Sequence, residues 1–145
     1  QARPARRVLV AVDFSACSHR AARLACELFH EAEITLFNAY SVKHEGRMRI
    51  GGASDEDIAA YLLSEQVRAE AAMRQLAFAL DSENCCRTVK VTVNGSAASA
   101  ILEEAATGYD VVVVGKTGER SREHRLGDVA THITYHTDCD VLLVP

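Results

Sequence analysis

The chain has 145 residues and 48% hydrophobic content, which suits one domain and provides enough apolar material for one sizeable core. Its 16 basic and 20 acidic residues give a formal charge of -4, which disfavours nucleic acid as a partner because phosphates need a concentrated basic face. No apolar run reaches the length that crosses a bilayer, and the first seven residues lack the apolar region of a secretory signal. We therefore expect one soluble, cytoplasmic domain over residues 1–145, with residues 1–6 as a disordered arm or a tag remnant.

The five cysteines are an odd number without a C-x-x-C pair, so neither a disulfide framework nor a zinc ribbon is indicated. Reduced thiols in a reducing cytosol are the better interpretation. Adjacent Cys85 and Cys86 would have to be exposed and reactive to sense oxidants. Only Arg87 adds positive charge beside them, so burial next to a strand is the preferred interpretation.

The first part of the chain alternates a strand with a helix. Residues 7–12 (RVLVAV) are a short continuous apolar run, typical of a parallel strand that is covered on both faces. From Ser18 to Glu31 the apolar residues recur at spacings of three and four, which predicts an amphipathic helix. Residues 34–40 predict a second strand. Residues 41–53 hold three glycines and several charges and predict a loop, either a functional lid or a disordered segment.

The rest of the chain continues the alternation. Ser54 and the three acidic residues after it are a good helix start, because serine caps the first turn and negative charge suits the positive end of the helix dipole. This helix should run to about Leu80. The remaining predicted elements are a strand at 88–93, a helix at 97–106, a strand at 111–114, a helix at 127–136 and a strand at 141–144.

Strands that alternate with helices require right-handed crossovers and a mainly parallel sheet. The sequence thus predicts an α/β fold, a doubly wound five-stranded sheet with helices on both faces. In such folds ligands lie beyond the carboxyl ends of the strands, where neighbouring crossovers leave in opposite directions. This rule points to Asp13, after the first strand, and Gly115, after the fourth.

A glycine-bearing loop connects the run of four valines to the next predicted helix. It begins with Gly115-Lys116-Thr117-Gly118 and ends at Gly127. Such a loop can offer backbone N–H groups and a positive helix dipole to a phosphate. Its cations, partly offset by two acids, add attraction for a polyphosphate, and they are Lys116, Arg120, Arg122 and Arg125.

Two common nucleotide motifs do not fit this loop. A P-loop needs a glycine five residues before its Gly-Lys pair, and that position holds Asp110. No G-x-G-x-x-G follows the first strand, where residues 13–16 read DFSA. A purely structural interpretation also stands, in which the glycines only turn the chain and the arginines are only solvated.

At this point the sequence resembles the universal stress protein family over nearly its whole length. Residues 8–15 (VLVAVDFS) are similar to the family's opening strand and Asp-x-Ser turn, and residues 34–39 to its second strand. Residues 110–118 are similar to its fourth strand and glycine loop, and residues 139–145 to its closing strand. The resemblance implies a Rossmann-like fold of the adenine nucleotide alpha hydrolase-like type, a homodimer and a non-catalytic role in stress response.

The resemblance also implies a nucleotide site. In nucleotide-binding members, the Asp after the first strand and a backbone position at the end of the second strand hold adenosine. The loop G-x2-G-x9-G-(Ser/Thr) wraps the ribose and phosphates. The candidate nucleotide-binding residues are therefore Asp13, Ala39, Gly115, Lys116, Gly118, Arg125, Gly127 and Asp128.

Two departures from the family's loop bear on the phosphates. Eight residues rather than nine separate Gly118 from Gly127, which shortens the reach of the loop by up to about 3.3 Å. Asp128 stands where Ser or Thr is expected, and its charge would repel phosphates by roughly 1 to 4 kcal/mol. A Mg²⁺ ion between them would reverse that sign. Alternatively, Asp128 only stabilises its helix, by about 0.3 to 1 kcal/mol.

Two other kinds of site have weaker support. His132 and His136 are four apart on a predicted helix with Cys139 nearby, but a structural zinc site needs a fourth ligand that the sequence does not supply. A hydrolase would need a G-x-S-x-G elbow, which is absent, and a triad cannot be inferred from sequence neighbours. The residues weighed for that role are Ser15, Cys17, Ser18 and His19.

The leading hypothesis is a non-catalytic regulatory protein that binds ATP, with or without Mg²⁺, and forms a homodimer through residues 141–144, which would otherwise be an exposed apolar edge. The rival hypothesis is a dimeric module that binds an unknown protein partner and no nucleotide. The shortened loop and Asp128 favour this rival. Slow ATP hydrolysis is a third hypothesis, for which no positioned base can be named.

Overall fold

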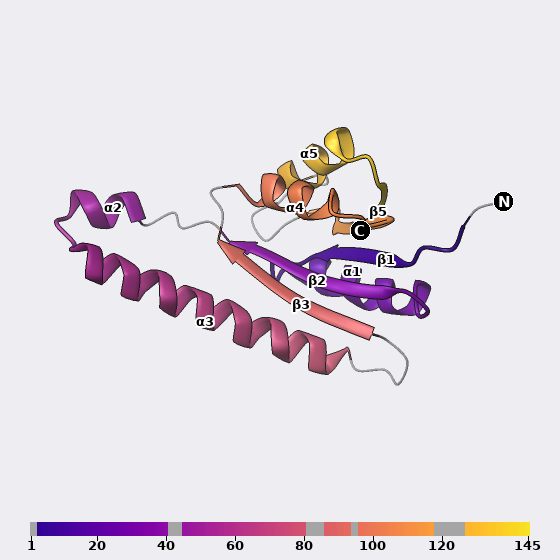
Figure 1. The fold of residues 1–145 in the computed structure, drawn as a ribbon, viewed down its shortest axis with the longest axis horizontal. Helices are drawn as coiled ribbons and strands as arrows, with labels where there is room; N and C mark the ends of the chain where they lie inside the picture. Colours follow the sequence, from indigo (N-terminus) through magenta and orange to yellow (C-terminus); the bar gives the residue numbers. More distant parts are fainter. Residues whose placement is uncertain (1–2, 41–44, 81–85, 94–95, 118–126) are drawn as a thin grey trace.

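The structure is a computed structural model, and it describes residues 3–40, 45–80, 86–93, 96–117 and 127–145. Strands and helices alternate along these residues as predicted, except that two helices, α2 and α3, lie between β2 and β3 (Figure 1). The elements are β1 (Arg7–Ala11), α1 (Ala16–Leu28), β2 (Glu33–Tyr40), α2 (Glu45–Ile50), α3 (Asp55–Ala79), β3 (Cys86–Val93), α4 (Ala97–Ala105), β4 (Val111–Gly115), α5 (Asp128–His136) and β5 (Asp140–Val144).

The five strands form one parallel sheet in the order β3-β2-β1-β4-β5. The chain first moves outward from β1 to β2 and β3, and then returns past β1 to β4 and β5. The crossover after β1 and the crossover after β4 therefore leave in opposite directions. The carboxyl ends of these two adjacent strands are the topological switch point of the sheet. The predicted doubly wound α/β fold is confirmed.

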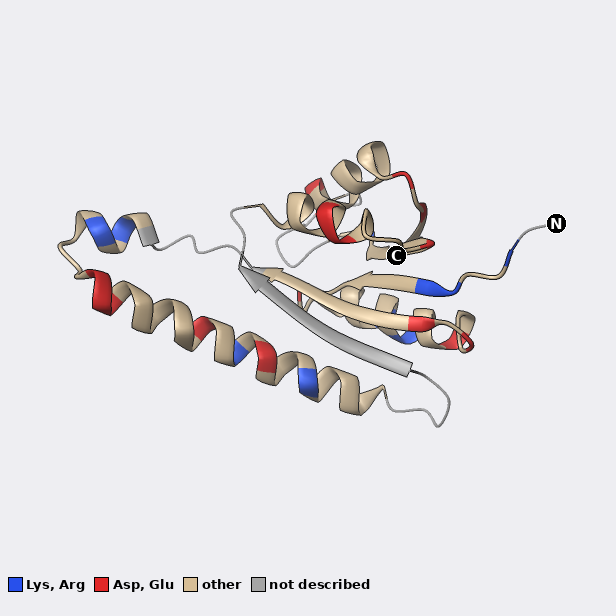
Figure 2. Cartoon of the chain, in the orientation of Figure 1, with Lys and Arg blue, Asp and Glu red and all other residues tan. Residues whose placement is uncertain are grey.

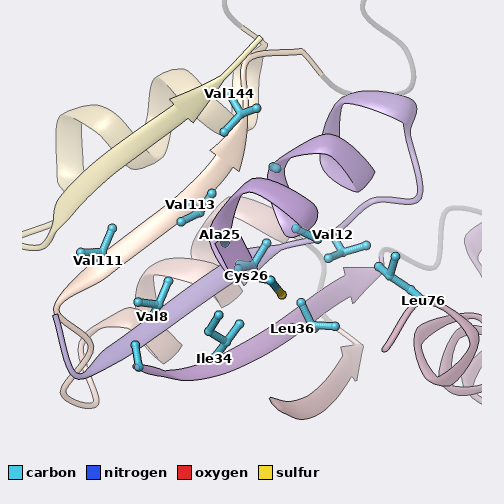
Figure 3. Close-up of a cluster of buried hydrophobic side chains, with 14 of the residues drawn as sticks. Val8, Val12, Ala25, Cys26, Ile34, Leu36, Leu76, Val111, Val113 and Val144 are labelled. Atoms are coloured by element: carbon cyan, nitrogen blue, oxygen red, sulfur yellow. The ribbon is translucent and has the colours of Figure 1, made fainter. Parts of the chain in front are cut away.

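Helices cover both faces of the sheet, and residues in β1 alternate between the two cores. Val8 and Val10 pack with α1 and α3 on one face, whereas Leu9 and Ala11 pack with α4 and α5 on the other. Figure 3 shows the first of these cores, with Ile34 of β2 beside Val8 and Leu36 further along the same strand. Burial on both faces explains why β1 and β4 are apolar at nearly every position.

Serine side chains cap three helices, α1, α3 and α4. The Ser15 hydroxyl accepts a hydrogen bond from the Ser18 N–H at 3.1 Å, so α1 begins at Ala16, two residues before the predicted start. The Ser54 hydroxyl accepts from Asp57 N–H at 3.1 Å, while the Asp57 carboxylate accepts from Ser54 N–H at 3.3 Å. This capping box confirms the predicted start of the long helix.

The prediction of a loop between β2 and the long helix was wrong in part. Residues 41–53 were expected to be a loop, but α2 occupies Glu45–Ile50, while residues 41–44 lie outside the described residues. The α2–α3 turn is closed by bonds from Gly51 N–H to Arg47 O and from Ala53 N–H to Met48 O. Gly52 adopts a φ of 87°, which glycine allows without strain. Two of the three glycines that predicted a loop, Gly51 and Gly52, therefore lie in the turn that ends the helix.

The other element boundaries lie close to the predictions. α1 ends at Leu28 rather than Glu31, because residues 29–31 form a turn in which Ala32 N–H donates to Phe29 O. Cys86 is the first residue of β3, whereas Cys85 lies outside the described residues. No helix within the described part of the chain has the length and apolar character needed to span a membrane.

At the amino edge of the sheet, Asp110 ties the chain before β4 to the start of β1. Its Oδ2 accepts hydrogen bonds from the N–H groups of Arg6 at 2.8 Å and Arg7 at 2.9 Å. Hydrogen bonds to a carboxylate favour its charged form. The Arg7 and Arg6 bonds, in that order of size, therefore lower the pKa of Asp110 below its ordinary value of 3.8.

Candidate functional site

Three of the candidate nucleotide-binding residues lie at the carboxyl edge of the sheet. Asp13 follows β1, Ala39 lies near the end of β2, and Gly115 is the last residue of β4. β1 pairs with both β2 and β4, so the three strand ends are neighbours. This edge is also the switch point, where a parallel sheet leaves room for a ligand.

Asp13 is held in a tight turn between β1 and α1. Its Oδ1 accepts hydrogen bonds from the Ser15 N–H at 2.9 Å and from the Ser15 hydroxyl. The Asp13 N–H donates to Ser18 Oγ at 3.3 Å. Phe14, between them, has a φ of 64°, which few residues other than glycine adopt. The turn therefore fixes the position of an exposed carboxylate at the end of β1.

Gly115 is required by packing. A Cβ atom there would lie 2.8 Å from Cys17 Sγ, closer than real Cβ atoms come, and 3.2 Å from the Cys17 carbonyl carbon, which is tighter than most real contacts. The Cys17 thiol donates to Val144 O at 3.1 Å, and the Lys116 N–H donates to the same carbonyl at 2.7 Å. The first turn of α1 thus packs tightly against the end of β4. This packing explains the glycine at residue 115 without any ligand.

The loop after β4 returns to its starting point. The Gly127 N–H donates to Lys116 O at 2.8 Å, so the two ends of the loop meet. This bond occupies the Gly127 amide and leaves the next amides, those of the first turn of α5, as candidate donors to an anion. Gly118 and Arg125 lie outside the described residues.

Asp128 is the first residue of α5, and its side chain is exposed. Gly127 caps the helix without a side-chain hydrogen bond. Because water screens an exposed charge, the repulsion between Asp128 and a phosphate belongs at the low end of the range given above. An exposed carboxylate beside a phosphate can also bind Mg²⁺.

Asn38 is a residue of this edge that sequence reasoning missed. It is only 4% exposed, and its Nδ2 donates to Val12 O at 2.7 Å, which ties the end of β2 to the residue before Asp13. Its Oδ1 is buried without a hydrogen-bond partner within the described chain. The only signal in the sequence is one amide within the otherwise mostly apolar run at 34–40.

The hydrolase candidates have structural roles. The Ser15 hydroxyl caps α1 and contacts Asp13, while the Ser18 hydroxyl donates to Ser15 O at 3.0 Å. Cys17 is buried against Gly115, and the His19 side chain is exposed. These contacts explain why serines cluster after β1.

The metal candidates do not converge. The rings of His132 and His136 are 4.5 Å apart, but the Cys139 thiol donates to Tyr109 O at 3.1 Å and lies 3.7 Å from Ala105 O. Within the described ranges, no group of three or more potential ligands could hold a metal ion.

Comparisons with known proteins agree with this fold. The model of the universal stress protein family matches residues 4–145. A search of curated proteins gave no match. Similar solved structures include hypothetical protein MJ0577, with a TM-score of 0.82 and 18% identity over 98% of this chain and 96% of that one. The universal stress protein UspA from Lactobacillus plantarum has a TM-score of 0.77 and 22% identity over 100% of both chains.

A third similar structure is a universal stress protein in complex with cAMP, with a TM-score of 0.67 and 21% identity over 98% of both chains. At these identities the solved structures support the fold, and the family model supports the membership. The chain belongs to the universal stress protein family.

Proposed function

We propose that this chain is a non-catalytic regulatory protein of stress response that binds an adenine nucleotide at the carboxyl ends of β1, β2 and β4. One observation carries the proposal: a fixed carboxylate, Asp13, lies at the switch point where the glycine loop also begins and ends. The cAMP complex of a similar family member supports the same ligand class.

The two ends of the nucleotide would use different parts of this edge. Asp13 and the backbone at Ala39 would hold adenosine, because they lie at the carboxyl ends of the neighbouring strands β1 and β2. Lys116 and the first amides of α5 would bind phosphates, because the loop closes at Lys116 and Gly127. Gly115, Gly118 and Arg125 complete the site by family resemblance. With ATP, Asp128 would hold Mg²⁺ between its carboxylate and the phosphates.

A second candidate function is a dimeric module that binds a protein partner and no nucleotide. Asp128 favours it, because without a cation an acid at the start of α5 opposes a phosphate. The structural reason for Gly115 favours it as well, since packing against Cys17 explains this glycine without a ligand.

Both functions would use a homodimer through β5. β5 is an edge strand that pairs with β4 alone, and its Leu143 is 36% exposed. Pairing with β5 of a second copy would cover this edge. We also place the protein in the cytoplasm, which the reduced thiols of Cys17 and Cys139 support.

The proposal is tested by calorimetric titration of nucleotide-free protein with ATP, with and without Mg²⁺, and with AMP. Saturable binding of ATP that Mg²⁺ strengthens is expected, and Asp128→Ser should improve binding in the absence of Mg²⁺ and reduce the effect of the cation. No heat and no thermal stabilisation at roughly millimolar ATP would leave the dimeric module as the function. Phosphate release is measured in parallel, and turnover would contradict the non-catalytic role.

Asp13→Asn is the sharpest variant, because an amide oxygen can still accept from Ser15 while the negative charge is lost. We expect weaker nucleotide binding without a change in the melting temperature of the free protein. Asp138→Asn is the matched control, because Asp138 is an exposed acid just before β5. It lies at the amino ends of the strands, away from the candidate site. Equal affinities of the two variants would remove Asp13 from the site.

A further inference from the structure

The outer side of α5 carries two histidines that lie one helical turn apart. His132 and His136 are both exposed, and their ring centroids are 4.5 Å apart with an angle of 43° between the ring planes. The inner side of the helix packs on the sheet through Ala130 and Ile133, which are buried. Because residues four apart share a helix face, α5 holds the two imidazoles side by side on a surface that dissolved ions reach.

Both imidazoles are available to a ligand. Among the residues that the structure describes, neither ring makes a hydrogen bond or an ion pair with another group. A neutral imidazole has one ring nitrogen with a lone pair, and this nitrogen is the commonest metal ligand in proteins. Two neighbouring rings with unused nitrogens are the arrangement that a metal chelate requires.

The spacing of the rings fits a right angle at the metal ion. A metal ion about 2.0 Å from a ring nitrogen lies about 3.2 Å from the centre of that ring. Two such rings have centres about 4.5 Å apart when the two bonds meet at about 90°, and about 5.2 Å apart at the tetrahedral angle of about 109°. The observed spacing of 4.5 Å matches the right angle. Square-planar and octahedral sites have right angles, and Cu²⁺ and Ni²⁺ favour them, whereas structural zinc sites are tetrahedral.

The charge around the pair is negative. Helices α4 and α5, which pack against each other, carry acidic residues and no Lys or Arg (Figure 2). The acids nearest to the pair in sequence are Asp128, one turn before His132, and Asp138, two residues after His136. Residues 127–145 as a whole contain three acids and no Lys or Arg. A local excess of negative charge attracts cations and repels anions, so this surface favours a metal ion over an anionic ligand.

We propose that His132 and His136 form an open two-histidine site for a divalent transition-metal ion, Ni²⁺ or Cu²⁺. Cys139 stays outside the site, because its thiol donates to Tyr109 O at 3.1 Å. Water completes the coordination of the ion, so the ion exchanges with the solution, unlike the ion of a closed structural zinc site. The site depends on neither nucleotide binding nor dimerisation.

The expected affinity is moderate. Four protein ligands give structural zinc sites nanomolar or tighter affinity, and two ligands supply roughly half of that binding free energy. The dissociation constant for Ni²⁺ therefore belongs between about 1 µM and 1 mM. Because the folded helix already holds both rings within one turn, little side-chain freedom is lost when the ion binds.

Calorimetric titration of tag-free, nucleotide-free protein with NiCl₂ tests the proposal. Ni²⁺ is the probe because, unlike Cu²⁺, it does not oxidise the thiols of the five cysteines. One ion per chain should bind, and His132→Asn and His136→Asn should each raise the dissociation constant by roughly tenfold or more. His30→Asn is the matched control, because His30 is exposed and has no other histidine within four residues.

Three results of this titration would overturn the proposal. The first is a native protein that binds no Ni²⁺ at a concentration of about 1 mM. The second is a loss of affinity in His30→Asn as large as in the two α5 variants. The third is a loss in only one of the α5 variants, because a chelate needs both rings.

A relocated histidine separates the arrangement of the pair from the number of histidines. His136→Asn combined with Thr134→His keeps six histidines in the chain, but residues 132 and 134 do not face each other on a helix. Thr134 is exposed, so the change leaves the core intact. The double variant should bind Ni²⁺ as weakly as His136→Asn alone. Native affinity in the double variant would overturn the proposal.

Zn²⁺ tests the angle at the metal ion. Titrated in the same way, Zn²⁺ should bind more weakly than Ni²⁺, because a tetrahedral site requires the rings to move about 0.7 Å further apart. Tighter binding of Zn²⁺ than of Ni²⁺ would overturn the right-angle geometry.

Discussion

Cys17 packs so closely on Gly115 that a Cβ atom at residue 115 would lie 2.8 Å from the Cys17 sulfur. The two residues belong to elements on either side of the switch point, the first turn of α1 and the last position of β4. Their contact fixes where the glycine loop leaves the sheet. It also explains a loop glycine by packing alone, which makes the contact testable without any ligand.

Gly115→Ala should destabilise the protein by about 1 to 3 kcal/mol, because the added methyl group meets the backbone as well as the sulfur of Cys17. Adding Cys17→Ala should recover part of this loss, since the contact at 3.2 Å with the Cys17 carbonyl carbon remains. Urea unfolding measures the free energy. Gly46→Ala is the control, because nothing lies within 4 Å of its added Cβ, and it should leave stability unchanged or raised. Equal effects at the two glycines would contradict the packing argument.

Ser15→Ala should lower both stability and nucleotide affinity. The loss of the α1 cap costs about 1 kcal/mol, and the Asp13 carboxylate loses the Ser15 hydroxyl that holds it. Ser54→Ala is the matched control, because it removes a similar cap from α3 and does not touch Asp13. Thermal unfolding and ATP titration of both variants check the prediction. If Ser54→Ala weakened binding as much as Ser15→Ala, the affinity loss would reflect stability alone.

Much of the fold follows from the sequence because its signals are local. The continuous apolar runs in β1 and β4 predict strands that are buried on both faces, and Ser54 predicts the start of α3. The positions of Asp13 and Gly115 at one edge follow from the rule for parallel sheets. These predictions need only neighbouring residues and the general topology of alternating strands and helices.

The rest depends on contacts between distant residues. Nothing near Gly115 in the sequence shows that Cys17 packs on it, since the contact joins β4 to α1. The importance of Asn38 could not be predicted from its mostly apolar run, because it depends on the carbonyl of Val12, just after the neighbouring strand β1. α2 was missed because the three glycines at 46, 51 and 52 are typical of loops, although two of them follow the last residue of the helix.

Asp110→Asn should reduce stability at neutral pH. The folded protein lowers the pKa of Asp110, so its carboxylate stabilises the fold at pH values above the ordinary pKa of 3.8. This contribution is lost as the pH falls from there through the lower pKa of the folded state. Urea unfolding of both proteins from pH 7 to pH 3 should therefore show a difference that narrows below about pH 4. A difference that stays constant over this range would contradict a role for the charge.

Asn38→Asp should destabilise the protein by about 2 kcal/mol or more at pH 7. The new carboxylate would be 96% buried, since Asn38 is 4% exposed, and it could no longer donate to Val12 O. Acid should recover part of the loss, because a protonated carboxyl group can again donate to that carbonyl. Thermal unfolding at pH 7 and pH 5 measures the recovery. Asp substitution of exposed Ser64 is the control, and an equally small effect at both positions would show that Asn38 does not hold β1 and β2 together at the candidate site.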